Sequence, residues 1–251
     1  MRLATVTITP YQCPMHMPTI LSVLTQADLL ALMWLFAAWI GIGWLTEHPP
    51  AKHPSVSTLM VNYRHEWMRQ FITRQPRIFD SAILQTLREG TTFFASASMI
   101  AIGGGMALIG NPESLRRVAG ELELGQAPTF LWQLKVMTAL FFVANAFLKF
   151  VWAHRLFGYC AILMASVPND ADDPFATIRA HQAAELNVTA AKSYNIGLRS
   201  VYFGLAALGW LAGPWMLFLT TTVVLALTWR REFASHSRAI MLRDLPSIGK
   251  I

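Results

Sequence analysis

Residues 200–229 form a run of thirty consecutive residues without a charge, and Gly213-Pro214 lies near its middle. As a single helix this run would be about 45 Å long, at about 1.5 Å per residue. The hydrocarbon core of a bilayer is only about 30 Å thick. The run therefore predicts either one badly mismatched membrane span or two short spans joined by a tight turn. The choice between them decides on which side of the membrane the C-terminus lies.

The composition supports a membrane protein. Of the 251 residues 54% are hydrophobic and only 14% are charged, and the mean hydropathy is +0.41. Soluble domains carry about 25% charged residues. The net charge of +6 comes from basic residues that flank apolar runs, so it indicates membrane loops and no nucleic-acid partner. We predict an all-α, multi-pass transmembrane bundle whose first partner is the lipid bilayer.

Three further apolar runs predict spans, at Leu29–Leu45, Thr91–Ile109 and Phe130–Phe150. If residues 200–229 supply two spans, the basic segments fall on one side and hold 16 of the 20 Lys and Arg residues. If they supply one span, the split becomes 11 to 9. Because cytoplasmic loops carry an excess of Lys and Arg, we predict five spans in the inner (plasma) membrane, with the N-terminus outside and the C-terminus cytoplasmic.

The Gly213-Pro214 pair agrees with two spans. Glycine can take the left-handed conformation that closes a helix, and proline suits the first turn of the next one. The alternative is a proline kink within one long helix. The predicted organisation is a disordered or extended leader over 1–25, a transmembrane helical domain over 26–235 and a cytoplasmic tail over 236–251.

The leader lacks a long apolar core and carries three prolines within its first eighteen residues, and either Met1 or Met17 could be its start. The two cysteines, Cys13 and Cys160, are expected on opposite sides of the membrane, so no disulfide is predicted. We predict no metal site and no cofactor.

Two segments outside the spans have an apolar character. Val56–Phe71 has helical periodicity, with an apolar and aromatic stripe backed by polar and basic residues. This pattern suits a cytoplasmic helix lying in the membrane interface, and packing against the protein's own cytoplasmic helices explains it equally well. Leu156–Val167 is apolar but too short to span, and we interpret it as an interfacial or buried segment.

Polar and small residues recur along the predicted spans. One candidate polar stripe comprises Asn145, Lys149, Trp152, Arg155, Asn195 and Arg199. Small and polar residues also align on the second span, at Thr92, Ser96, Gly103, Ala107 and Gly110, and on the fourth, at Ala206, Gly209 and Gly213. Such faces permit close helix contact, so helix packing is the leading interpretation, and a solvated path or ligand site is the alternative.

Asp80 follows the break at Pro76 and has apolar neighbours, which indicates a partly buried carboxylate. We predict a structural ion pair, with Arg77 as the first candidate partner and Arg155 or Arg199 as alternatives. A helix N-cap is the competing role for Asp80.

Four ordered stretches resemble a known family: TRQPRIFDSAILQTLREGTTFFASASMIAIGG, FLKFVWAHRLFGY, NIGLRSVYFGLAALGWLAGPW and RREFASHSR. The chain is similar over roughly residues 28 to 240 to the membrane family called domain of unknown function 599. The resemblance implies a multi-pass membrane protein of the kind found in bacteria and plants. It implies no activity, so it assigns no role to any residue.

Catalytic motifs are missing from the sequence, including the Walker loop, HExxH and GxSxG. We therefore expect no enzyme. The favoured function is a non-enzymatic scaffold, an accessory subunit of a larger membrane complex or a self-assembling homo-oligomer. The alternative is an oligomeric channel or transporter with basic cytoplasmic entrances.

Overall fold

The structure is a computed structural model of the 251-residue chain, and it describes residues 24–111 and 129–243. The elements in this part are all helical: α2 (Gln26–Glu47), α3 (Val56–Phe71), α4 (Ile78–Gly110), α6 (Thr129–Ala165), α7 (Pro174–Leu208), the 3-10 helix η1 (Gly209–Ala212), α8 (Pro214–Phe233) and α9 (His236–Arg243). The predicted all-α class is confirmed. Almost all of the predicted leader, with Cys13, and the last eight residues of the predicted tail lie outside the described residues.

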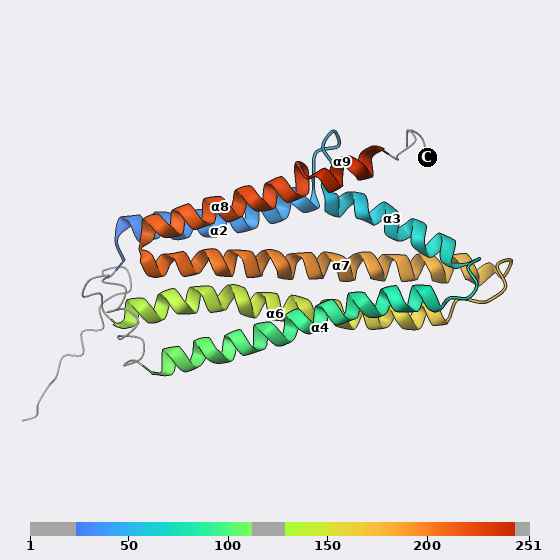
Figure 1. Cartoon of the computed structure of the whole chain (residues 1–251), viewed down its shortest axis with the longest axis horizontal. Coiled ribbons are helices and arrows are strands. Elements are labelled where there is room, and N and C mark those ends of the chain that lie inside the picture. Colours follow the sequence, from blue (N-terminus) through green and yellow to red (C-terminus); the bar gives the residue numbers. More distant parts are fainter. Residues whose placement is uncertain (1–23, 112–128, 244–251) are drawn as a thin grey trace, which may run out of the picture.

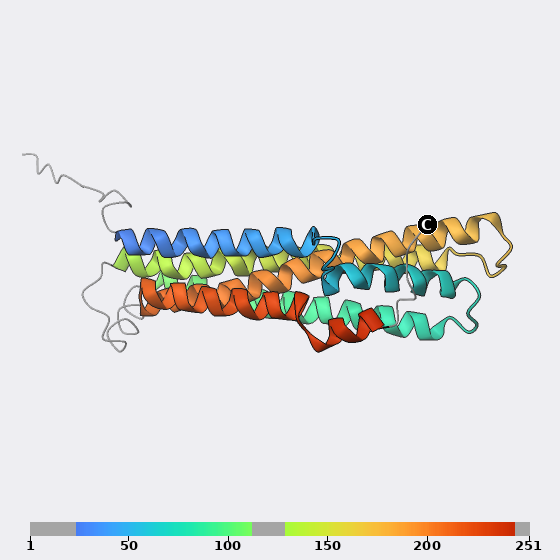
Figure 2. The same cartoon turned by 90° about the horizontal axis from the view of Figure 1, so that it is seen from above.

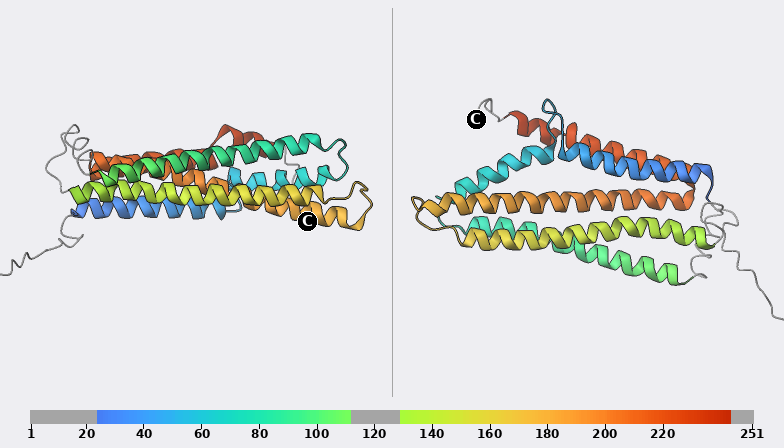
Figure 3. Two further views of the ribbon diagram at one scale, coloured as in Figure 1. Left: turned by 90° about the horizontal axis from the view of Figure 1, so that it is seen from below. Right: turned by 180° about the vertical axis from the view of Figure 1, so that it is seen from behind.

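The helices form an elongated bundle around α7, which runs along its length (Figures 1 and 2). Along one half, α2 and α8 lie on one side of α7, and α6 and α4 lie on the other (Figure 1). We call this the apolar half. Along the other half, α3 replaces α2 and α8 beside α7 (Figure 3). We call this half, with the adjoining ends of α4, α6 and α7, the extension.

Three helices in the described part are long and apolar enough to cross a membrane: α2, α4 and α6. Each contains one of the three separate spans predicted from the apolar runs. The core of the apolar half includes four fully buried residues from α2, α6, α7 and η1: Leu35, Phe142, Phe203 and Trp210. The chain is therefore built as a membrane protein, with lipid as the natural contact of its outer surface.

The thirty-residue uncharged run is broken where the sequence predicts. Gly213 has a φ of 113°, which glycine adopts without strain, and Pro214 opens α8. The chain reverses there, and α8 returns beside α7 (Figure 1). A Cβ at Gly209 would lie 2.5 Å from Thr220 Oγ1, so only glycine permits this approach of η1 to α8. The turn is confirmed, and the kinked single helix is excluded.

The segment Leu156–Val167 was predicted to be interfacial or buried, and its burial is confirmed, but it is not a separate segment. Residues up to Ala165 continue α6 without a break, and at 37 residues this helix is about 55 Å long. Inside the extension its Phe157 and Cys160 pack against buried alanines of α7, among them Ala180 and Ala184. The segment is therefore neither separate nor interfacial, because it forms one arm of the α6–α7 hairpin.

Of the two interpretations of Val56–Phe71, the structure supports packing against the protein's own helices. The segment is helical, as predicted, but α3 lies along α7 in the direction of the bundle axis (Figures 1 and 3). The predicted apolar stripe comprises Val56, Met60, Tyr63, Trp67 and Phe71. The buried residues of α3 are Leu59, Met68 and Phe71, so only Phe71 of the stripe is buried. Packing against the protein's own helices, the second interpretation of this segment, is the one that the fold supports.

Candidate functional site

The predicted polar stripe does not converge on one site. Asn145 Nδ2 donates a hydrogen bond to Ser200 Oγ at 2.6 Å and so links α6 to α7. Trp152 and Arg155 lie on the outer surface, where Arg155 donates to the Tyr159 hydroxyl at 2.9 Å. The guanidinium of Arg155 also lies 5.7 Å from the centre of the Trp152 ring. The polar stripe therefore divides into an internal helix contact and an external aromatic cluster.

The other members of the stripe are Lys149 on α6 and Asn195 and Arg199 on α7. Lys149 and Asn195 are half-buried, and neither side chain forms a hydrogen bond or an ion pair within the described part of the chain. Arg199 alone enters a larger network of charges, at the point where the apolar half meets the extension.

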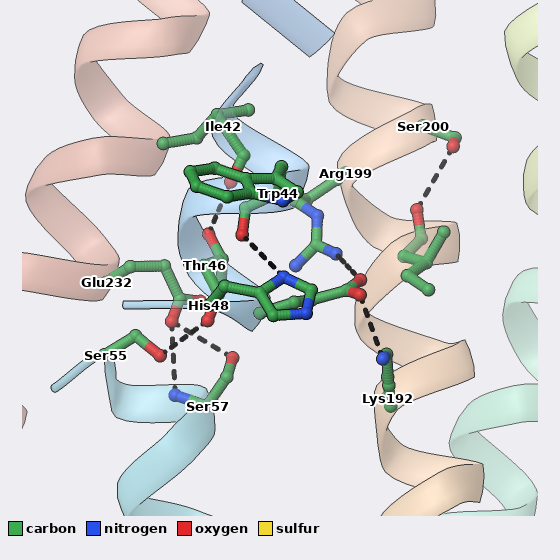
Figure 4. Close-up of polar contacts among 12 residues, drawn as sticks. Ile42, Trp44, Thr46, His48, Ser55, Ser57, Lys192, Arg199, Ser200 and Glu232 are labelled. Carbon is green, nitrogen blue, oxygen red and sulfur yellow. Dashed lines mark hydrogen bonds and ion pairs between the residues drawn. The ribbon is translucent and has the colours of Figure 1, made fainter. Parts of the chain in front are cut away.

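This network begins at the C-terminal end of α2, where Glu47 lies between two cations. Arg199 Nη2 lies 3.1 Å from Glu47 Oε1, and Lys192 Nζ lies 2.9 Å from Glu47 Oε2 (Figure 4). The Arg199 side chain is 8% exposed, whereas that of Lys192 is 53% exposed. The buried ion pair with Arg199 is therefore the one that water screens least.

A second carboxylate joins two more helices at the same level. Glu232 of α8 accepts hydrogen bonds from the backbone N–H and the hydroxyl of Ser57, at 3.2 and 3.0 Å (Figure 4). Ser57 lies in the first turn of α3, where the helix dipole favours a negative charge. Next to it, Ser55 caps α3 and donates to the Thr46 carbonyl at 2.9 Å.

We call Glu47, Lys192, Arg199, Ser57 and Glu232 the junction cluster. Its two carboxylates and two cations balance in charge, and each carboxylate has at least two donors. Such a network fixes the four helix segments α2, α3, α7 and α8 against one another. The arrangement stabilises the junction through ion pairs and hydrogen bonds.

The ion pair predicted for Asp80 exists, but the predicted partner was wrong. Asp80 is completely buried, and its Oδ1 accepts from Arg74 Nη1 at 2.5 Å and from Trp67 Nε1 at 2.6 Å. Arg155 and Arg199 are engaged elsewhere, as described above. The alternative role as helix cap is not supported, because the N-cap of α4 is Arg77 and it is not capped by a side chain.

Arg77 was predicted to pair with Asp80, but it forms hydrogen bonds to backbone carbonyls instead. Its guanidinium donates to the backbone carbonyls of Val167 and Pro168, both at 2.8 Å, and of Ile72 at 3.2 Å. It therefore binds the end of the α6–α7 hairpin to the connection between α3 and α4. Arg74 and Arg77 together stabilise this end of the extension, one through a carboxylate and the other through carbonyls.

Three side chains on the extension could hold a metal ion. His65 of α3 and His181 and Glu185 of α7 place one ligand atom each within 4.8 Å of one another. Burial lowers the pKa of His65, but the hydrogen bonds to Glu185 and to the Val61 carbonyl outweigh it and raise the pKa above its ordinary value. In the sequence, the only indication of a metal site is that His181 and Glu185 are one helical turn apart on α7. Nothing in the sequence indicates that His65 lies beside them.

These features define a class: an all-helical protein with several helices long and apolar enough to cross a membrane, and with an extension held together by an apolar core and by polar contacts. The family model described as "Protein of unknown function, DUF599" matches residues 30–237. The chain belongs to this family, as the four sequence stretches predicted. No curated protein and no solved structure matches the chain significantly.

Proposed function

We propose that the chain is a non-enzymatic subunit of a membrane assembly and that it associates with further copies of itself through α4. One observation carries this proposal. The five small or polar residues that align on α4 are all exposed: Thr92, Ser96, Gly103, Ala107 and Gly110. A face of this kind lets a second helix approach closely.

The exposure of α4 is unusual within this bundle. Only 6% of its most apolar stretch is buried, against 28% for α2 and 33% for α6. A Cβ added at Gly103 or Gly110 would meet nothing within 4 Å, so the chain itself does not use these positions. The opposite face of α4, by contrast, packs tightly, since a Cβ at Gly105 would lie 2.5 Å from Leu140.

The small residues of α7 and η1 differ, because they pack against other helices of the same chain. Ala206 is buried, and Gly209 is covered by Thr220 of α8. Gly204 likewise packs against Phe142 of α6, whose nearest atom would lie 3.3 Å from a Cβ added at this glycine. Of the two predicted small-residue faces, therefore, the one on α4 is the one left for a partner.

The proposed topology has five spans: α2, the apolar parts of α4, α6 and α7, and α8. In the described part, most basic residues lie on the extension or near the junction, whereas Lys135 lies in the second turn of α6, at the opposite end of the apolar half. The positive-inside rule then supports an extension in the cytoplasm of the cell, with the apolar half in the inner membrane.

A channel or transporter, the alternative function, receives less support. Asn145 of α6 bonds directly to Ser200 of α7, and the neighbouring buried residues are apolar. This arrangement favours a packed subunit over a wet path.

The test of the proposal is the substitution Gly103→Leu, with Gly41→Leu as the matched control. Both glycines lie on apolar helices, and a Cβ added at either meets nothing within 4 Å of the same chain. In native mass spectrometry from mild detergent we expect oligomers for the unaltered protein and for Gly41→Leu, and monomers for Gly103→Leu. An unaltered protein that stays monomeric at every concentration would refute the proposal.

A further inference from the structure

Both ring nitrogens of His65 face oxygen atoms that can only accept hydrogen bonds. Nδ1 lies 2.9 Å from the carbonyl oxygen of Val61, and Nε2 lies 2.8 Å from Oε1 of Glu185. A neutral imidazole has a single N–H group. If the carbonyl fixes that proton on Nδ1, the lone pair of Nε2 points at a carboxylate. The short contact then requires a positive charge between these atoms, either a second proton or a metal ion.

A second imidazole lies beside this pair. His181 is one turn before Glu185 on α7, and its Nε2 lies 3.9 Å from Glu185 Oε1. The rings of His65 and His181 have their centres 5.7 Å apart. Two nitrogens and a carboxylate oxygen, from two neighbouring helices, therefore surround one small volume.

The dimensions suit a transition metal after small side-chain rotations. Ligand atoms that each lie about 2.0–2.2 Å from a tetrahedral Zn²⁺ are about 3.3–3.6 Å apart. The three atoms here lie within 4.8 Å of one another. The side chains of His181 and Glu185 are 67% and 56% exposed, so they are free to rotate by this amount.

We propose that His65, His181 and Glu185 bind one divalent transition-metal ion of the zinc type. Two imidazoles and one carboxylate suit such ions, whereas Ca²⁺ and Mg²⁺ prefer ligand sets made of oxygen. The hydrogen bond from Nδ1 of His65 to a backbone carbonyl is the usual support of a metal-bound histidine, because it fixes both the tautomer and the ring orientation. The exposed side leaves a fourth position for water.

The bound ion ties α3 to α7 about two turns from the junction cluster. Ser57 of that cluster belongs to α3, so the metal strengthens the anchoring of the same helix at a second point. The site lies on the extension, away from the exposed face of α4. The metal-binding proposal and the self-association proposal can therefore be tested independently of each other.

The experiment uses the full chain in mild detergent, free of any affinity tag and stripped with a chelator. Calorimetric titration with Zn²⁺ is expected to show one ion per chain. Titration with Co²⁺ is expected to give the visible absorption bands of four-coordinate cobalt. His181→Gln and Glu185→Gln are each expected to weaken Zn²⁺ binding at least about tenfold, since even losing a supporting hydrogen bond weakens metal sites about 10–100-fold. His53→Gln removes an exposed histidine elsewhere and should change nothing.

One further variant separates the metal site from a plain ion pair. His65→Lys keeps a positive charge beside Glu185 but supplies a protonated amine in place of a ligand. We expect it to retain the unfolding temperature of the metal-free protein and to lose Zn²⁺ binding. The proposal is overturned if Zn²⁺ does not bind, or if it binds equally well to His65→Lys, His181→Gln and Glu185→Gln. In that case the cluster is only an imidazolium–carboxylate pair.

Discussion

Arg74→Met is expected to destabilise the protein more than Asp80→Asn, although the two residues form one ion pair. The reason is their unequal burial. Asp80 is 0% exposed, whereas the side chain of Arg74 is 34% exposed. Without Arg74 the carboxylate stays in apolar surroundings with Trp67 as its remaining donor. Removing one partner of a buried pair in this way costs about 3–5 kcal/mol of the free energy of unfolding.

Asp80→Asn has milder consequences. The amide oxygen of asparagine can still accept the hydrogen bond from Trp67, and the partly exposed Arg74 can turn toward water. The expected loss is therefore about 1–3 kcal/mol, the usual effect of losing a buried hydrogen bond. The double variant should resemble Asp80→Asn alone, because an amide needs no counter-ion.

Chemical unfolding in mild detergent, followed by tryptophan fluorescence, measures these differences. Arg69→Met is the matched control, since Arg69 pairs with Glu66 on the surface of α3, and an exposed ion pair of this kind contributes little to stability. The reasoning fails if Asp80→Asn destabilises as much as Arg74→Met. It also fails if the effects of the two changes simply add in the double variant.

Two further predictions concern the topology and the junction cluster. A reporter protein fused after Ile251 is expected to show a cytoplasmic C-terminus, because most basic residues then lie on one side; a periplasmic signal would contradict the five-span topology. Arg199→Met is expected to lower the free energy of unfolding by about 1.5–3 kcal/mol, because it removes a charged hydrogen bond to Glu47 that is largely buried. Lys192→Met should cost no more than about 1 kcal/mol, since its pair with Glu47 is half exposed, and equal losses in the two variants would show that burial does not distinguish them.

The features that the sequence predicts best are those that depend on a few neighbouring residues. The turn at Gly213-Pro214 is an example, because the backbone preferences of glycine and proline act locally. The apolar runs within α2, α4 and α6 are another, since lipid requires an uninterrupted apolar surface there.

Helix lengths were harder to predict for a physical reason. Hydropathy indicates which part of a helix can lie in lipid. The helix itself continues as long as its backbone hydrogen bonds and its packing contacts continue. Lys149 ends the apolar run of α6 and does not end the helix, which continues to Ala165. The whole extension was therefore missed as a unit, although the helical character of Val56–Phe71 was predicted.

Partners across the fold were the least predictable. Arg74 and Arg77 are three residues apart in the irregular connection between α3 and α4. Because this connection has no helical or strand periodicity, the sequence does not indicate which of the two side chains turns inward. The buried carboxylate was correctly predicted at Asp80, but only the fold shows that Arg74 reaches it. In the same way, 120 positions separate His65 from Glu185, and their contact depends on how α3 lies along α7.

The continuity of α6 and α7 has a mechanical consequence. Both helices pass through the apolar half and the extension without a break, so the two halves move together. If about 30 Å of α6 lies in the bilayer, about 25 Å projects beyond it. A change in tilt of about 10°, as a change in bilayer thickness can cause, would then swing the far end sideways by about 4 Å. A small change of tilt in the lipid therefore produces a larger displacement at the far end of the hairpin, at the connection between α6 and α7.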